Sequence, residues 1–427
     1  MGYRSKMAGT AVWLRLIFFV ALLRSPLMYA GDYTHVDQYV LNLSRAGEED
    51  LLKLTHTLVS PFKADSEKVR AVYRWIAANI EYDIQAYQER RPVSSKPEDV
   101  LKKRRSVCGG YAALFKEMIS LAGLEAEIVT GYSKGYGYEF GSVFAEHNLH
   151  AWNAVRIADR WRLLDPTWGA GHIDENSRFV RSFNDYYFLT PPEELILTHY
   201  PHETRWQLLD PKKTKKEFEE FVYLRPAFFK YGMKIISHPT LRITAQDSLK
   251  VILAASRSAR FVSRLQYGEN TLDGMLTFTQ RKGDSVEVYA VFPLAASYTL
   301  RLFANDSRES AKYEWALDYQ VDAKVSHAAT VGFPEKYLSF DVYNAYLYAP
   351  FNRFLNPGSA VYFKMSIPKA EEAALIFEDT FTFLKKNGHY FEGEPVIPEG
   401  EFYLGAKLPG SNYYHYLLKY DGWKQGQ

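Results

Sequence analysis

The sequence of 427 residues has only one cysteine and almost no excess of charge of either sign. Because Cys108 stands alone, the chain cannot form an internal disulfide, a Cys₂ or Cys₄ structural zinc site or an iron–sulfur cluster. The chain has 52 lysines and arginines and 50 acidic residues, which gives a net charge of +2. It therefore lacks the excess of positive charge that attracts nucleic acid. We therefore expect no nucleic-acid partner, and no motif calls for a metal or another cofactor.

Aromatic residues, in contrast, are abundant. The chain holds 27 Phe, 8 Trp and 32 Tyr, which is 16% of its residues. Such side chains are common on β-sheet faces, in interfaces and in grooves that bind glycans or peptides. The hydrophobic share of 47% is that of a folded protein, and the length corresponds to two to four domains of roughly 150 residues each.

Residues 1–30 have the layout of a secretory signal peptide. Basic residues precede an apolar run over residues 16–23, and Arg24 ends that run. The run is short for about 30 Å of hydrocarbon, so we expect cleavage and a secreted or periplasmic protein. The alternative is a retained anchor, in which case this segment alone contacts the membrane. An exported chain that keeps one unpaired thiol is unusual, which favours a reactive role for Cys108.

Two changes of pattern divide the rest of the chain. Residues 31–210 mix helices and strands, and apolar residues at positions 69, 72, 73, 76 and 80 predict a helix that begins near Ser66. The charged stretch that begins at Pro211 predicts a linker or a solvated helix turn, and a domain boundary. Helical periodicity nearly vanishes after it.

The carboxyl-terminal half predicts two all-β sandwiches, over residues 211–325 and 326–427. Short alternating runs at 285–292, 297–305, 359–367 and 412–421 are separated by Gly, Pro, Asn and Asp. Aromatic-rich runs near Phe218 and Phe333 begin two weakly similar repeats. We expect most of the aromatic excess to fill the cores of these sandwiches.

The strongest chemical signal is the order Cys108, His150, Asp165. A thiol is a good nucleophile at neutral pH only when its thiolate is stabilised. Cys108 precedes a helical pattern, so its sulfur would lie at the positive end of a helix dipole. The pair Gly109 and Gly110 would let a substrate backbone come close, and free amides there could bind an oxyanion. A histidine could take the thiol proton.

His150 and Asp165 are expected on one hairpin. If Ala158 and Asp159 form a two-residue turn, the numbers of paired residues sum to 317 and Asp165 faces Trp152. His150 shares a face with Trp152, so Asp165 becomes its diagonal neighbour and can orient the imidazole. A turn longer or shorter by one residue would place the two on opposite faces.

These pieces, Cys108 at a helix start, H-A-W-N at His150 and D-P-T-W at Asp165, resemble the transglutaminase-like superfamily of papain-type cysteine enzymes. The stretch from Tyr186 and the β modules after it are similar to the kyphoscoliosis peptidase branch. The resemblance implies an α+β papain-like transglutaminase core followed by two Ig-like sandwiches. It also implies Cys108 as nucleophile, His150 as general base and acid, and Asp165 as orienting carboxylate. Ser106 departs from the glycine that is frequent there in the superfamily.

We infer acyl transfer through a thioester, in which the Cys108 thiolate attacks a peptide bond or a glutamine side-chain amide. A protein or peptide at a cell surface or cell wall is the expected substrate, and a small amide stays open. Hydrolysis and cross-linking share every step up to the acyl-enzyme, and we favour protease or amidase activity. The alternative is a non-catalytic adhesion or scaffold protein whose β modules bind a surface partner.

Three weaker features are a possible zinc site, a glycine-rich segment and a group of tryptophans. His147 and His150 with Asp165 or His172 fit no standard zinc motif. The glycine-rich segment from Gly131 is a flap over the cleft or an ordinary loop. Three tryptophans near the triad either line the cleft or pack in the core: Trp152, Trp161 and Trp168.

Overall fold

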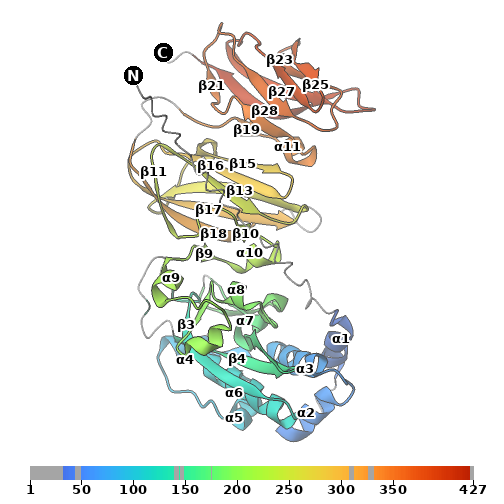
Figure 1. The fold of residues 1–427 in the computed structure, drawn as a ribbon, viewed down its shortest axis with the longest axis vertical. Helices are drawn as coiled ribbons and strands as arrows, with labels where there is room; N and C mark the ends of the chain where they lie inside the picture. Colours follow the sequence, from blue (N-terminus) through green and yellow to red (C-terminus); the bar gives the residue numbers. More distant parts are fainter. Residues whose placement is uncertain are drawn as a thin grey trace, which may run out of the picture.

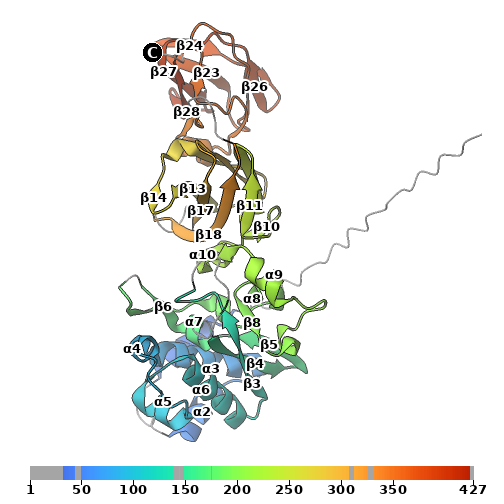
Figure 2. The same ribbon diagram turned by 90° about the vertical axis from the view of Figure 1, so that its left-hand side faces the viewer.

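The computed structural model describes residues 32–43, 50–138, 144, 149–174, 176–306, 312–325 and 331–423. The expected signal segment, residues 1–30, lies outside them. Figures 1 and 2 show three bodies stacked along one long axis, with an α/β body at one end and two β-sandwiches above it. Among the described helices, none is long and apolar enough to cross a membrane.

The first body packs helices against a four-stranded antiparallel sheet in the order β5-β4-β3-β8. Its helices are α1 (Thr34–Asn42), α2 (Leu51–Val59), α3 (Asp65–Asn79), α4 (Ile84–Gln88), α5 (Pro97–Lys103), α6 (Cys108–Leu121), α7 (Pro166–Ala170) and α8 (Pro192–Leu195), with 3₁₀ turns η2 (Asp185–Tyr187) and η3 (Thr204–Gln207). Its strands are β1 (Glu81–Tyr82), β2 (Arg105–Ser106), β3 (Ala126–Ser133), β4 (Leu149–Ile157), β5 (Arg160–Leu164), β6 (Gly171–Ile173), β7 (Phe179–Arg181) and β8 (His199–Pro201).

The predicted helix near Ser66 is α3, and its apolar face is fully buried as the periodicity indicated. It begins one residue before the predicted start, at Asp65. The Glu67 carboxylate accepts a hydrogen bond of 3.3 Å from the Ala64 amide and so caps the first turn.

The hairpin of β4 and β5 has the predicted register. Ile157 pairs with Arg160 and Asn153 with Leu164, so the paired numbers sum to 317. Ala158 and Asp159 have φ angles of 48° and 61°, as a two-residue type I′ turn requires. This register places His150 and the residue after β5 on the same side of the sheet.

Asn153 attaches this sheet to α6. Its buried side-chain amide donates to the Ala112 carbonyl of α6 at 3.0 Å and to the Glu127 carbonyl of β3 at 3.2 Å. Gly131 allows β8 to approach the other edge of β3, because a Cβ there would overlap the Tyr200 carbonyl. Helix and sheet therefore hold a fixed position on each other.

The glycine-rich segment that we expect to be a flap over the cleft or an ordinary loop begins at Gly131, inside β3. Residues 134–138 follow as a turn, and residues 139–143 lie outside the described part of the chain. The buried Lys134 donates to the Phe221 carbonyl at 2.9 Å, so this turn contacts the segment that leads into the first sandwich.

The charged stretch after Pro211 contains a helix, α9 (Lys215–Glu220), which begins with a capping box between Thr214 and Glu217. The first sandwich follows it with one sheet in the order β10-β12-β16-β15 and another in the order β11-β18-β17-β13-β14. Its elements are β9 (Tyr223–Leu224), α10 (Pro226–Lys230), β10 (Lys234–Ile235), β11 (Arg242–Ala245), β12 (Ser248–Ala254), β13 (Ala259–Tyr267), β14 (Asn270–Thr271), η4 (Gly274–Leu276), β15 (Thr277–Lys282), β16 (Ser285–Val291), β17 (Ser297–Asp306) and β18 (Glu314–Ala323).

The second sandwich repeats this topology element by element, with sheets β20-β22-β26-β25 and β19-β28-β27-β23-β24. In both sandwiches a short strand runs parallel to the last one, β11 beside β18 and β21 beside β28, so the predicted repeat is confirmed. Its elements are β19 (Glu335–Lys336), α11 (Leu338–Val342), β20 (Tyr346–Ala349), β21 (Phe354–Leu355), β22 (Phe363–Ser366), β23 (Glu372–Phe377), β24 (Thr380–Phe383), β25 (Lys385–Asn387), β26 (Tyr390–Gly393), β27 (Gly400–Lys407) and β28 (Tyr414–Gly422).

The two sandwiches share a well-bonded interface. The Gln280 side chain donates to the Leu347 carbonyl at 3.1 Å and accepts from the Leu347 amide at 2.9 Å. Lys336 donates to the Thr279 carbonyl at 2.9 Å. Phe278 of the first sandwich belongs to the apolar core cluster of the second.

Candidate active site

Asp165 follows β5 directly and caps the first turn of α7. Its Oδ1 atom accepts hydrogen bonds from the amides of Thr167 at 2.8 Å and Trp168 at 3.1 Å. Pro166, which has no amide hydrogen, stands at the first helical position. The carboxylate is fully buried, and these bonds fix its orientation.

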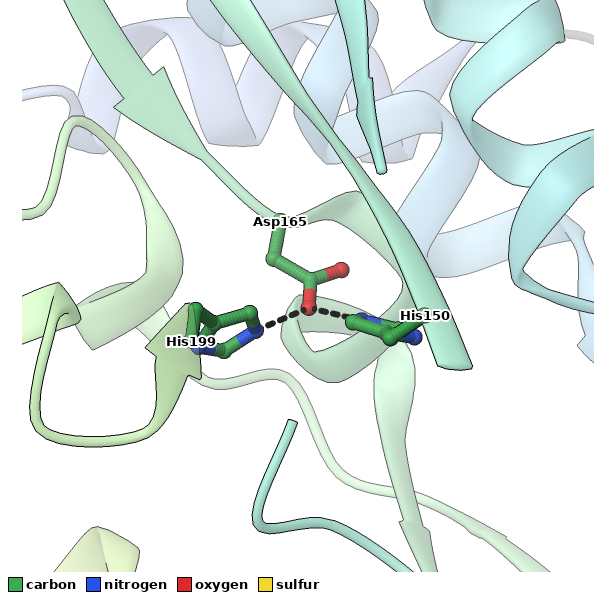
Figure 3. A group of neighbouring side chains, drawn as sticks. All are labelled: His150, Asp165 and His199. Atoms are coloured by element: carbon green, nitrogen blue, oxygen red, sulfur yellow. Dashed lines mark hydrogen bonds and ion pairs between the residues drawn. The ribbon is translucent and has the colours of Figure 1, made fainter. Parts of the chain in front are cut away.

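The second carboxylate oxygen of Asp165 bonds two histidines (Figure 3). His150 Nε2 lies 2.7 Å from Oδ2, and His199 Nε2 lies 3.1 Å from the same atom. His150 comes from β4 and His199 from β8, which lie on opposite sides of β3. The carboxylate therefore holds both rings.

Cys108 is the first residue of α6 and is partly exposed. The His150 ring and the Ala151 backbone amide are polar neighbours of its sulfur, and both lower the pKa of the thiol. Because Nε2 of His150 faces Asp165, Nδ1 is the ring atom left for the thiol. Burial raises the pKa of the Cys108 thiol, but the hydrogen bond and charge of His150 outweigh burial and lower it.

The charges of His150 and Asp165 support each other. Burial lowers the pKa of His150, but the Asp165 carboxylate and Cys108 raise it more, to about 10. Burial also raises the pKa of Asp165, whereas the two histidines hold it well below its usual range. The geometry thus favours an imidazolium between a carboxylate and a thiolate at neutral pH.

His199 is a site residue that sequence reasoning missed. It is fully buried, and its Nδ1 lies 2.9 Å from the Thr198 hydroxyl. Burial lowers its pKa more than Asp165 raises it, so the ring is neutral and donates its Nε2 hydrogen to Asp165. Local periodicity carries no signal for it, because the residue reaches the site through the pairing of β8 with β3.

The expectation for Gly110 is wrong. Its amide donates to the Val107 carbonyl at 2.9 Å within the helix start. A Cβ at this position would overlap the Ser106 side chain, so the missing side chain serves packing rather than the approach of a substrate. The amides of Cys108 and Gly109, the first two of α6, have no acceptor within the helix and remain suited to an oxyanion.

The three tryptophans divide between core and site. Trp152 is buried in a small core cluster, and Trp161 packs against the same cluster. Trp168 contacts both site histidines, with ring centroids 5.5 Å from His150 and 4.4 Å from His199. Trp152 also contacts both histidines, with ring centroids 6.1 Å from His150 and 5.1 Å from His199, but it is buried, whereas Trp168 is only partly buried and keeps surface for a substrate.

Two tyrosines that the sequence did not single out lie near Cys108. The thiol contributes to raising the pKa of Tyr82 and of Tyr87, although burial is the larger cause for both. The two rings contact each other with centroids 6.2 Å apart.

Among the described residues, His150, Asp165 and His199 form a group that could hold a metal ion, because their ligand atoms lie within 4.8 Å of one another. These atoms are hydrogen-bonded to each other, which satisfies them without an ion. His172 lies in β6 and is not part of this group, and His147 lies outside the described residues.

Comparisons with known proteins agree with this architecture. Residues 53–166 match the family model described as the transglutaminase-like superfamily, and residues 215–334 match a KY-like, immunoglobulin-like domain. The kyphoscoliosis peptidase of Mus musculus is 36% identical over 271 residues, which cover 63% of this chain and 40% of the mouse protein. The Homo sapiens protein of the same name is also 36% identical, over 63% of this chain and 39% of its own length.

Hillarin from Drosophila melanogaster is 31% identical over 214 residues, or 47% of this chain and 26% of hillarin. The chain thus spans about two fifths of the length of the mouse and human relatives that it matches. It joins a transglutaminase-like core to Ig-like β-sandwiches, the first of them KY-like, and is related to the kyphoscoliosis peptidases.

Proposed function

We propose that this protein is a cysteine-dependent acyl-transfer enzyme that acts on carboxamides of peptides or of glutamine side chains. The observation that carries the proposal is the chain of contacts from Cys108 through His150 to Asp165. A structural cysteine needs neither a histidine partner nor an ion pair buried behind that histidine. The same three residues are the nucleophile, base and orienting group that the sequence predicted.

In the first step the Cys108 thiolate attacks the carbonyl carbon of the amide. The oxyanion that develops is stabilised by the amides at the start of α6. Imidazolium His150 gives its proton to the leaving nitrogen, so the C–N bond breaks and a thioester remains on Cys108.

In the second step water or a primary amine attacks the thioester. Neutral His150 takes the proton from the attacking group and keeps it as the Cys108 thiolate leaves, which restores the imidazolium–thiolate pair. Asp165 stays ionised throughout and keeps Nε2 of His150 protonated, which leaves Nδ1 to exchange the proton. Water gives hydrolysis and an amine gives cross-linking. We favour hydrolysis of a protein or peptide at a cell surface or cell wall.

Trapping the acyl-enzyme tests this proposal. The full chain is incubated with a cell-surface extract, quenched in acid, and its mass and tryptic peptides are measured. We expect an acyl adduct on Cys108 that hydroxylamine releases. It should be absent from Cys108→Ala and retained in His238→Ala, which changes a histidine of the first sandwich. A new carboxylate on the substrate then indicates hydrolysis, whereas incorporation of a labelled primary amine indicates cross-linking.

The opposite outcome would support the non-catalytic alternative. If Cys108 forms no adduct with any extract, while Cys108→Ala keeps all binding to cell surfaces, then the core only positions the β modules. Export is also part of the proposal. Sequencing the amino terminus of protein recovered outside the cell tests it, and a mature end near residue 31 is the expected result.

A further inference from the structure

Strand β24 is an exposed edge with an apolar composition. It pairs with β23 on one side, and of the strands that the structure describes none pairs with its other side. All four of its residues, Thr380–Phe383, are exposed, with 41% of Phe381 and 61% of Phe383 accessible. Figure 2 shows β24 in the sandwich farthest from the transglutaminase-like core.

The equivalent strand of the first sandwich is different. It is β14, which holds only Asn270 and Thr271. A short polar edge is the usual protection of a β-sheet against pairing with other chains. The second sandwich lacks this protection at the same place in the same topology.

The free hydrogen-bonding groups of β24 can be assigned from its hairpin. Phe377 and Thr380 close the two-residue turn, so they form a hydrogen-bonded pair, and the pattern alternates from there. The Leu384 amide indeed donates to the Ala373 carbonyl. The backbone groups of Thr380 and Thr382 therefore point to β23, whereas those of Phe381 and Phe383 point outward.

A second copy of this strand satisfies these groups in one antiparallel register. When Phe381 of one copy pairs with Phe383 of the other, both phenylalanines in each copy use their outward N–H and C=O groups, and Thr382 lies on the two-fold axis. Phenylalanine then faces phenylalanine on one side of the new sheet.

The charges that flank β24 complement each other in the same register. The turn before the strand carries Glu378 and Asp379, and the strand is followed by Lys385 and Lys386. Antiparallel pairing about Thr382 brings the turn of one copy, with Asp379, close to the start of β25 in the other, with Lys385, and does so twice. A parallel pairing would instead place like charges side by side.

We propose that β24 joins two copies of this chain into a dimer through a continuous antiparallel sheet with its axis at Thr382. The occupant of the edge is thus a second copy rather than a strand of another protein. This inference does not depend on the acyl-transfer activity.

Disulfide trapping tests the register. Cys108→Ser removes the native thiol, so Thr382→Cys in that background has one cysteine per chain. Facing residues of a non-hydrogen-bonded pair have Cα atoms about 4.5 Å apart, within the range of about 4.4–6.8 Å that a disulfide spans. We expect rapid conversion of Thr382→Cys to a covalent dimer under mild oxidation, and at least tenfold slower conversion of the control Thr380→Cys. Equal rates would overturn the register.

Analytical ultracentrifugation tests the dimer itself. Phe383→Lys should raise the dissociation constant at least tenfold, whereas Thr271→Lys on β14 should leave it unchanged. Asp379→Lys and Lys385→Asp should each weaken the dimer several-fold, and the double variant should restore it. A chain that stays monomeric at tens of micromolar, or a double variant weaker than both singles, would overturn the proposal.

Discussion

Replacing Asp165 with asparagine should reverse the proton arrangement of the site while keeping its shape. The Oδ1 atom can still accept from the amides of Thr167 and Trp168. The amide nitrogen then takes the place of Oδ2 and donates to Nε2 of His150. This forces the proton of the neutral ring onto Nδ1, which faces Cys108 and can no longer receive the thiol proton.

The size of the effect follows from the thiolate population. In the native protein the carboxylate raises the pKa of His150 to about 10, and the charged ring lowers the pKa of Cys108. A thiol of ordinary pKa, near 8.5, is only about 3% ionised at pH 7, so loss of the ion pair lowers the thiolate fraction about 30-fold. A thiolate of lower pKa is intrinsically less nucleophilic, so we expect alkylation to slow about tenfold.

The single cysteine makes the assay direct. Intact-mass measurement of iodoacetamide incorporation between pH 5 and 10 reports on Cys108 alone. The native chain should react well below pH 8, whereas Asp165→Asn should react appreciably only as pH approaches 8.5. Asp318→Asn is the matched control, because Asp318 is a buried carboxylate of the first sandwich that pairs with Arg301. If Asp165→Asn keeps the native pH profile, the ion-pair account is refuted.

Three further substitutions probe the support of the site. His199→Leu removes one donor from Asp165 and should slow alkylation of Cys108 several-fold with little change in fold, as judged by circular dichroism. Asn153→Leu removes the two hydrogen bonds that join β4 to α6 and β3, and should lower the free energy of unfolding by about 1–3 kcal/mol in urea titration; an unchanged midpoint would contradict the assigned bonds. Gly169→Ala should destabilise by about 1–3 kcal/mol because its methyl overlaps the Tyr73 hydroxyl, and adding Tyr73→Phe should recover part of the loss.

Local chemistry made part of the site predictable. The two-residue turn at Ala158 fixes which residues face each other, so the proximity of His150 and Asp165 could be derived from numbering alone. The helix start at Cys108 followed from the apolar spacing after it. Both are short-range features in which a turn or a helical period links residues that are close along the chain.

The remaining features depend on pairings between distant segments. His199 contacts Asp165 only because β8 pairs with the far edge of β3. Strand β8 has three residues, too few for its sequence pattern to indicate which strand it pairs with. The role of Gly110 was not evident from the sequence, because its missing side chain makes room for Ser106 of β2 and Val100 of α5, and only the fold brings these residues against α6. The capping box at Thr214, in contrast, was present in the sequence and would have indicated a helix in the charged stretch.

The interface between the sandwiches has a consequence for how the chain unfolds. Phe278 lies on a strand of the first sandwich but packs in the apolar core of the second. The side-chain amide of Gln280 is hydrogen-bonded to both the carbonyl and the amide of Leu347. Removing the first sandwich would open the core of the second, so the two should melt as a single thermodynamic unit. The hinge that a chain of separate modules would have at this point is replaced by a rigid joint.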